Sequence, residues 1–163
     1  MAHMSTSAPA ALAWSTDNCP IGRAMEILGE SGTVIVLREI FNGVRRFDLM
    51  QRHSGLSRAV LSHRLALLVE HGIVQRVAYR EPGDRERHEY RLTQRGFDLQ
   101  PVMVALADWG GTHLSGSDGP AVEVEHRGCG ARAHVALVCE DGHQVDRLRD
   151  VRTRPGPGAL PFT

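Results

Sequence analysis

Apolar residues recur at helical spacing between Ser57 and Gly72. Leu61, Leu65 and Leu68 fall on one side of a helix drawn through this stretch. The opposite side carries only small, polar or cationic residues before Glu70, namely Arg58, Ala59, Ser62, His63, Arg64 and Ala66. The hydroxyl of Ser57 can cap the first turn, and Gly72 suits the left-handed residue that follows a last turn. The pattern predicts one amphipathic helix with a defined start and end.

The outer face of this helix has the chemistry of a DNA-reading surface. Short side chains let a helix backbone approach the major groove, hydroxyl and imidazole groups can bond base edges, and Arg can bind guanine or phosphate. An ordinary solvated helix is the alternative, although such helices usually carry charges of both signs. The neighbouring elements must therefore decide between the two.

The pattern on either side predicts a helix-turn-helix followed by a wing. Earlier helices are expected from Pro20 to Leu28, from about 33 to 42 and from about 48 to 53, with Gly55 in the turn before the amphipathic helix. After Gly72 the period changes to that of strands, at 73–79 and 88–92, around a charged turn at 80–87. Thr93 then caps a helix expected to run from 94 to about 113. The predicted fold class is mostly α (α+β): a winged helix-turn-helix with a long C-terminal dimerisation helix and a small C-terminal β-rich appendage.

Composition shifts divide the chain into five expected segments. These are a mobile N-terminal arm (1–16), a DNA-binding and dimerisation domain (17–114), a linker (115–120), a small β-hairpin or degraded zinc-ribbon-like unit (121–153) and a disordered tail rich in Pro and Gly (154–163).

The charge of the chain is balanced overall but unevenly spread. Lys plus Arg and Asp plus Glu both number 19, and every cation is Arg. Between positions 44 and 64, five arginines stand against one acid, Asp48. Three cysteines, an odd number, argue against a disulfide framework and fit a reducing cytoplasm. We find no apolar run of membrane-spanning length, no phosphate-binding Gly-rich loop and no Ser-His-Asp arrangement, so a cytoplasmic protein without enzymatic activity and without a membrane partner is expected.

The helix expected at 94–113 carries more apolar surface than a small winged domain needs. Its apolar positions are Phe97, Leu99, Val102, Met103, Leu106 and Trp109. Surplus apolar area on a terminal helix commonly forms a dimer interface. The alternative is that this helix folds back onto its own core.

Several motifs in order resemble the HxlR family of bacterial transcription regulators. They are 19–24 (CPIGRA), 28–29 (LG), 37–40 (LREI), 43–47 (GVRRF), 61–65 (LSHRL), 72–74 (GIV), 90–96 (YRLTQRG) and 109–110 (WG). The resemblance implies a winged helix-turn-helix that dimerises through its first and last helices and binds operator DNA near promoters, as an activator or a repressor. The resemblance also implies a sensor of electrophiles or oxidants at Cys19, since some members of the family use the cysteine of this Cys-Pro motif in this way. Where the family usually has a Lys-Trp pair, this chain has Ser31–Gly32.

Ten residues form the predicted contact with double-stranded DNA. Ser57, Arg58, Ser62 and His63 are assigned to the major groove, Arg45, Arg46 and Arg64 to phosphates, and Arg80, Arg85 and Arg87 on the wing to an adjacent minor groove or its backbone. Arg58 is the expected base reader. Arg64 could instead bridge to an acid within the domain. A homodimer would read a pseudo-palindromic operator, and the competing interpretation is a winged-helix module used for protein–protein contact.

Two further candidate sites involve cysteines. Cys19 directly precedes a helix, whose N-terminus favours the reactive thiolate, and the alternative is a buried, inert cysteine. In the tail, His126, Cys129, Cys139 and His143 could hold a structural zinc ion, although neither pair matches a Cys-x-x-Cys knuckle. A metal-free β-hairpin and a Cys129–Cys139 disulfide are the alternatives there. No other cofactor is expected.

Overall fold

The structure, a computed structural model, describes residues 14–80, 83 and 85–162. This part of the chain divides into two compact units, one of residues 30–136 and the other of residues 14–29 together with 137–162. Both differ from the segments expected from composition, because the first helix and the second half of the appendage belong to the same unit. Most of the expected N-terminal arm, 1–13, lies outside the described residues.

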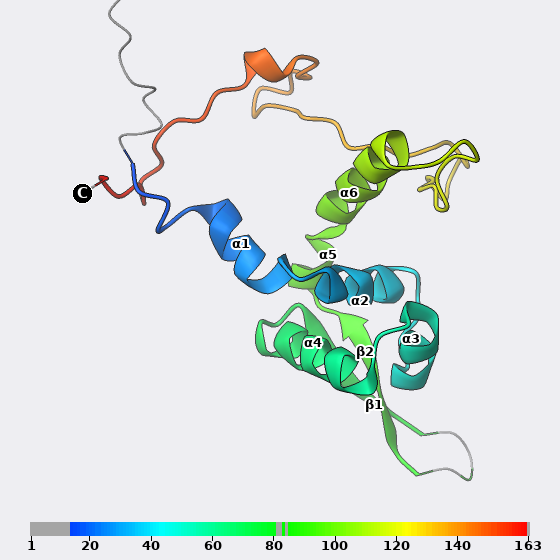
Figure 1. The fold of residues 1–163 in the computed structure, drawn as a ribbon. Coiled ribbons are helices and arrows are strands. Elements are labelled where there is room, and N and C mark those ends of the chain that lie inside the picture. The colour runs from blue at the N-terminus through cyan, green and yellow to red at the C-terminus, as the bar shows by residue number, and fades with distance from the viewer. Residues whose placement is uncertain (1–13, 81–82, 84, 163) are drawn as a thin grey trace, which may run out of the picture. The chain divides into compact units, whose positions relative to one another are not determined.

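Three helices form the body of the larger unit. Helix α2 (Ser31–Phe41) packs against both α3 (Phe47–Ser54) and α4 (Arg58–Glu70), as Figure 1 shows. The buried apolar residues come from these helices, the two strands that follow and the turn before the first strand, namely Val36, Leu37, Ile40, Met50, Leu61, Leu65, Leu68, Ile73, Val74 and Leu92. The three leucines of α4 are therefore turned inward, which confirms the predicted side of that helix.

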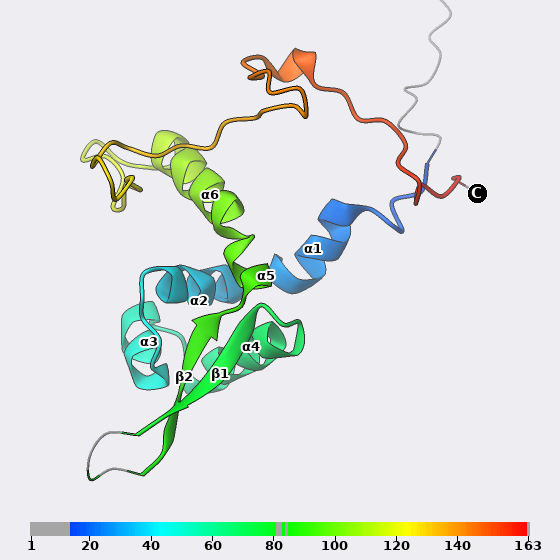
Figure 2. The ribbon, with the colours of Figure 1, turned by 180° about the vertical axis from the view of Figure 1, so that it is seen from behind.

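A two-stranded hairpin completes the winged helix. Strand β1 (Val74–Tyr79) pairs antiparallel with β2 (Arg87–Leu92), and β1 lies against α4 (Figure 2). The segment before α3 forms an isolated bridge to β2: Arg46 pairs with Glu89, and the Tyr90 N–H donates to the Arg45 carbonyl at 2.8 Å. These contacts join the start of α3 to the wing. The predicted α+β winged helix is confirmed.

The long C-terminal helix is broken in two. Helix α5 (Gln94–Phe97) ends three residues before α6 (Gln100–His113), so the prediction of one continuous helix from 94 was wrong. Pro101 explains the break, since proline has no N–H to donate to the Phe97 carbonyl and its ring clashes with that group in a continuous helix. The cap at Thr93 is confirmed, because its hydroxyl accepts from the Gly96 N–H at 3.2 Å.

Within the larger unit, the segment after α6 covers one side of this helix. Val104, Ala107 and Asp108 face the segment 120–133, and Arg132 forms an ion pair with Asp108 at 2.9 Å. On another side, Val102, Leu106 and Trp109 are 44%, 51% and 58% exposed. None of the residues of α6, all of which the structure describes, is buried. Within the larger unit, the segment after α6 therefore leaves the apolar stripe exposed.

The smaller unit joins the two ends of the described chain. Helix α1 (Pro20–Leu28) follows Cys19, and a short 3-10 helix spans Leu148–Asp150. The tail expected to be disordered instead pairs with residues near Trp14: the Ser15 N–H donates to the Leu160 carbonyl, and the Asn18 side chain donates to the Gly158 carbonyl, each at 2.9 Å. Composition alone did not predict this pairing, because the partner segment is distant in sequence.

A buried carboxylate links α2 to α3. The side chain of Glu39 is fully buried, and it accepts hydrogen bonds from Arg38 and contacts His53 Nδ1. Burial by itself raises the pKa of Glu39, but hydrogen bonds and charges from Arg38 and His53 outweigh burial and hold the pKa below its ordinary value of 4.5.

We expect Glu39 to make the protein sensitive to acid. A lowered pKa in the folded state means that the unfolded chain binds more protons, so the stabilisation is complete above the ordinary carboxyl range and is lost as the pH falls through the folded-state pKa. Chemical denaturation between neutral and acidic pH should show a steeper loss of unfolding free energy in the wild type than in Glu39→Gln. Parallel losses in the two proteins would contradict this role.

No helix in the described part of the chain is both long enough and apolar enough to span a membrane.

Candidate nucleic-acid interface

The outer face of α4 is open and its start is fixed by a cap. The Ser57 hydroxyl accepts from the Val60 N–H at 3.3 Å, and Gly72 takes a left-handed φ of 64° after the helix ends. The residues assigned to the major groove, Ser57, Arg58, Ser62 and His63, are all exposed. The structure thus brings these four polar side chains together on one accessible helix surface.

The turn between α3 and α4 sets the angle of that surface. Gly55 has a φ of 70°, a conformation that costs glycine little because it has no Cβ. Its N–H donates to the Gln51 carbonyl at 3.2 Å, and the Ser54 hydroxyl accepts from the Leu56 N–H at 3.3 Å. These local bonds close α3 and lead into α4 within three residues, Gly55, Leu56 and Ser57.

Arg58 lies over the aromatic ring of Phe47. Its guanidinium carbon is 5.0 Å from the ring centroid, which is the geometry of a cation–π contact. Phe47 begins α3 and is half-buried, so the ring restrains an arginine that remains exposed. The sequence pattern indicates only that a helix starts near Phe47 and gives no sign of this contact between Phe47 and Arg58.

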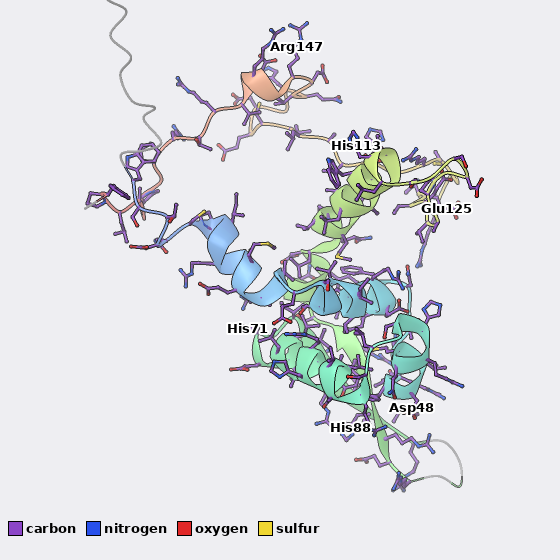
Figure 3. The ribbon with its side chains drawn as sticks, in the orientation of Figure 1. Asp48, His71, His88, His113, Glu125 and Arg147 are labelled. Atoms are coloured by element: carbon purple, nitrogen blue, oxygen red, sulfur yellow. The ribbon has the colours of Figure 1, made fainter. Side chains whose placement is uncertain are left out.

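Arg45 and Arg46 lie at the junction of α3 with the wing. Both are exposed, and their backbone is held by β2 through the bridge and hydrogen bond described above. The Arg46 guanidinium carbon lies 4.8 Å from the Tyr79 ring centroid. This is a second cation–π contact, and the spacing of apolar residues in the sequence did not predict it. Asp48 and His88, labelled in Figure 3, are the exposed neighbours of this junction on α3 and β2. The junction therefore presents two exposed arginines beside two acidic residues, Asp48 and Glu89.

Arg64 is turned into the domain. Its side chain is only 12% exposed and forms an ion pair with Glu30, the alternative that the sequence left open. A Cβ placed on Gly32 would lie 3.7 Å from Arg64 Nε, so the arginine occupies the space beside this glycine. The larger Trp that the resemblance leads one to expect at this position would compete for that space. Arg64 is thus poorly placed for a phosphate.

The wing arginines stay accessible. Arg80, Arg85 and Arg87 are exposed, with Arg80 just after β1 and Arg87 at the start of β2. Positions 81, 82 and 84 of the charged turn lie outside the described residues.

The candidate sensor cysteine belongs to the smaller unit. Cys19 is a free, half-exposed thiol at the N-cap of α1, beside a hollow that the residues around Trp14 and 153–160 line. Arg23 donates to the Asn18 side chain at 3.3 Å.

The four predicted zinc ligands form two separate turns. His126 Nδ1 lies 3.2 Å from Cys129 Sγ in the larger unit, and Cys139 Sγ lies 3.6 Å from His143 Nδ1 in the smaller one. All three cysteines of the chain are free thiols in the structure.

A tri-helical core with a turn, an exposed polar helix and a wing defines the class of winged helix-turn-helix DNA-binding proteins. Comparison with known proteins agrees and is more specific. The family model described as HxlR-like helix-turn-helix matches residues 27–118. The chain belongs to this family.

The relatives and solved structures that the chain resembles are described as transcriptional regulators or transcription factors. The uncharacterised HTH-type transcriptional regulator Rv3095 of Mycobacterium tuberculosis is 44% identical over 138 residues, covering 85% of this chain and 86% of the relative. The solved structure of PA1607, a proposed transcription factor, has a TM-score of 0.75 and 30% identity over 86% of this chain and 96% of its own. The reduced form of the transcriptional regulator YodB from Bacillus subtilis has a TM-score of 0.50 and 26% identity, over 58% of this chain and 93% of its own. The protein is accordingly a transcriptional regulator with a helix-turn-helix DNA-binding domain.

Proposed function

We propose that the protein acts as a homodimer that binds a pseudo-palindromic operator and regulates transcription from it. The observation that carries the proposal is the two-sided character of α4, with leucines buried beneath and four polar residues exposed above. Two copies of that face, related by a two-fold axis, would meet half-sites about one helical turn of DNA or a multiple apart. The regulator would act in the cytoplasm, and no enzymatic step is part of the proposal.

Each exposed residue has a proposed role. Ser57, Ser62 and His63 would contact base edges or the groove wall, with Arg58 reading a base through its planar fork of donors. Arg45 and Arg46 would hold phosphates beside the groove, and Arg80, Arg85 and Arg87 would follow the adjacent backbone or minor groove. Arg64 is left out because its guanidinium pairs with Glu30.

Salt dependence separates this proposal from a winged helix used for protein contact. Each phosphate contact releases counterions, so the logarithm of the binding constant should fall linearly with the logarithm of salt, with a slope near −0.9 per contact. The affinity for an operator found by footprinting, measured by anisotropy titration, should therefore fall steeply as the salt concentration rises. Affinity that is insensitive to salt would favour the protein-contact alternative.

The apolar stripe of α6 supports the dimer. Val102, Leu106 and Trp109 recur at helical spacing and are exposed, while the segment 120–133 already covers another side of the helix. The Trp109 ring also contacts the His113 ring, with centroids 5.4 Å apart. Aromatic surface therefore extends from the stripe to His113, the last residue of α6. Contiguous exposed apolar surface of this kind usually marks an interface. A second copy of this chain would bury the stripe, because a two-fold symmetric interface places the same surface of each subunit against the other.

A charge placed in the stripe should separate the subunits. Leu106→Glu would bury two carboxylates in an apolar contact, so we expect dimer affinity to fall by about tenfold or more in sedimentation equilibrium. Gln100→Glu adds the same charge at an exposed position off the stripe and should leave the dimer intact. Equal oligomeric states for the wild type and Leu106→Glu would contradict the interface.

Cys19 carries a second part of the proposal, a response to oxidants or electrophiles. Its thiol is free, half-exposed and at the N-cap of α1, so a small oxidant can reach it. We expect mild oxidant to change operator affinity of the wild type and not of Cys19→Ser, measured by anisotropy with Cys129→Ser as the matched control. Identical responses in the wild type and Cys19→Ser would remove Cys19 as the sensor.

A further inference from the structure

The turn from Cys139 to His143 is closed by backbone hydrogen bonds. The Cys139 N–H donates to the His143 carbonyl at 3.0 Å, and the Gly142 N–H donates to the Cys139 carbonyl at 2.9 Å. Val138 bridges to Gln144 on either side, which extends the turn into a small hairpin. Gly142 takes a φ of 81°, which reverses the chain. The two residues that start and end the turn are thereby held next to each other.

Three ligand atoms converge at this turn. Cys139 Sγ, an Asp141 carboxylate oxygen and His143 Nδ1 all lie within 4.8 Å of one another, and all three side chains are exposed. A tetrahedral zinc ion with Zn–S near 2.3 Å and Zn–N near 2.05 Å requires a separation of about 3.6 Å between its sulfur and nitrogen ligands. The observed distance from Cys139 Sγ to His143 Nδ1 is 3.6 Å. The pair is already spaced as a zinc ion would hold it.

The turn from His126 to Cys129 differs in ways that matter for metal binding. Its nitrogen–sulfur distance is 3.2 Å, shorter than the separation that a tetrahedral ion requires, although both pairs lie within the range of a hydrogen bond to sulfur. Across residues 14–80, 83 and 85–162, only the Cys139 turn gathers three potential ligands of this kind. Its hairpin is otherwise similar, with the Gly130 N–H donating to the His126 carbonyl at 2.8 Å. It therefore serves as an internal control.

We propose that Cys139, Asp141 and His143 bind a zinc ion, with the fourth position open to water. Thiolate, imidazole and carboxylate together suit Zn²⁺ and its substitute Co²⁺, whereas Mg²⁺ and Ca²⁺ prefer oxygen ligands alone. Binding replaces the thiol proton of Cys139, so one proton is released for each ion bound. The site adds Asp141 to the residues suggested by the sequence and leaves out His126 and Cys129.

Cobalt provides the test on the full-length, metal-stripped protein. Adding Co²⁺ should produce the visible bands of a tetrahedral ion and a thiolate-to-cobalt charge-transfer band, and Zn²⁺ should displace both with one ion bound per chain. Cys139→Ser should abolish the charge-transfer band, and Asp141→Asn and His143→Ala should each weaken Co²⁺ binding by about tenfold or more. Circular dichroism of each variant checks that the fold is retained.

The control variants decide between arrangements of the site. His126→Ala and Cys129→Ser should bind Co²⁺ as the wild type does. Absence of the charge-transfer band in the wild type would overturn the proposal. An equal loss in Cys129→Ser and Cys139→Ser would overturn it in favour of a four-residue site, and unchanged binding in Asp141→Asn would remove the carboxylate from the ligand set.

Discussion

Replacing Leu65 with alanine should lower the unfolding free energy by about 2–5 kcal/mol, the range measured for large cavities in well-packed cores. Leu65 is only 1% exposed and lies between Leu61 and Leu68 on the buried side of α4. Shortening it removes apolar contacts and leaves a cavity beneath the helix that presents the polar face. Urea denaturation followed by circular dichroism measures the change.

The adjacent residue provides the control for this substitution. Ala66 is exposed on the outer face, so Ala66→Ser should change stability by about 0.5 kcal/mol or less. If Leu65→Ala were as stable as Ala66→Ser, the inward orientation of the leucines would be wrong.

Replacing Arg58 with alanine should weaken specific operator binding by about 1–3 kcal/mol, or roughly 5- to 150-fold in Kd. The Phe47 ring restrains the Arg58 side chain while leaving it exposed, which reduces the entropy lost when the guanidinium binds a base. Because an exposed cation–π contact contributes only about 0.5–1 kcal/mol, the variant should remain folded. Anisotropy titrations on specific and scrambled duplexes measure the loss.

The comparison between duplexes distinguishes base reading from phosphate binding. Arg58→Ala should lose affinity mainly for the operator, whereas loss of a phosphate contact weakens binding to both duplexes about equally. Arg95→Ala, which removes an exposed arginine from α5, should bind like the wild type. Unchanged operator affinity in Arg58→Ala would remove it as the base reader.

The sequence predicted the parts of the fold that local patterns control. The spacing of Leu61, Leu65 and Leu68 determined which side of α4 is buried, and the caps at Ser57 and Thr93 marked where helices begin. The change of period after Gly72 located the wing. These signals depend on residues within one or two turns of each other, so they can be interpreted without tertiary structure.

Features that depend on distant partners were not predicted. Nothing near Phe47 or Tyr79 in the sequence indicates that their rings support Arg58 and Arg46, since each contact joins two elements. The inward turn of Arg64 depends on Glu30 and on the space beside Gly32, both in or before another helix.

Two other features of the structure differ from the sequence predictions, each for a different reason. The break before α6 follows from Pro101, which is a local signal in the sequence. The prediction of one continuous helix relied on the apolar spacing and gave this proline too little weight. The tail pairs with residues near Trp14 because backbone partners are available there, although its Pro and Gly content favours disorder in isolation.

Photo-crosslinking from the outer face of α4 tests the central claim most directly. A benzophenone-bearing residue at position 62, where Ser62 is exposed, should crosslink to bases within each operator half-site, and the same group at the exposed position 95 on α5 should not. Crosslinks confined to position 95, with none from position 62 on operator DNA bound at full occupancy, would contradict the assignment of α4 to the major groove.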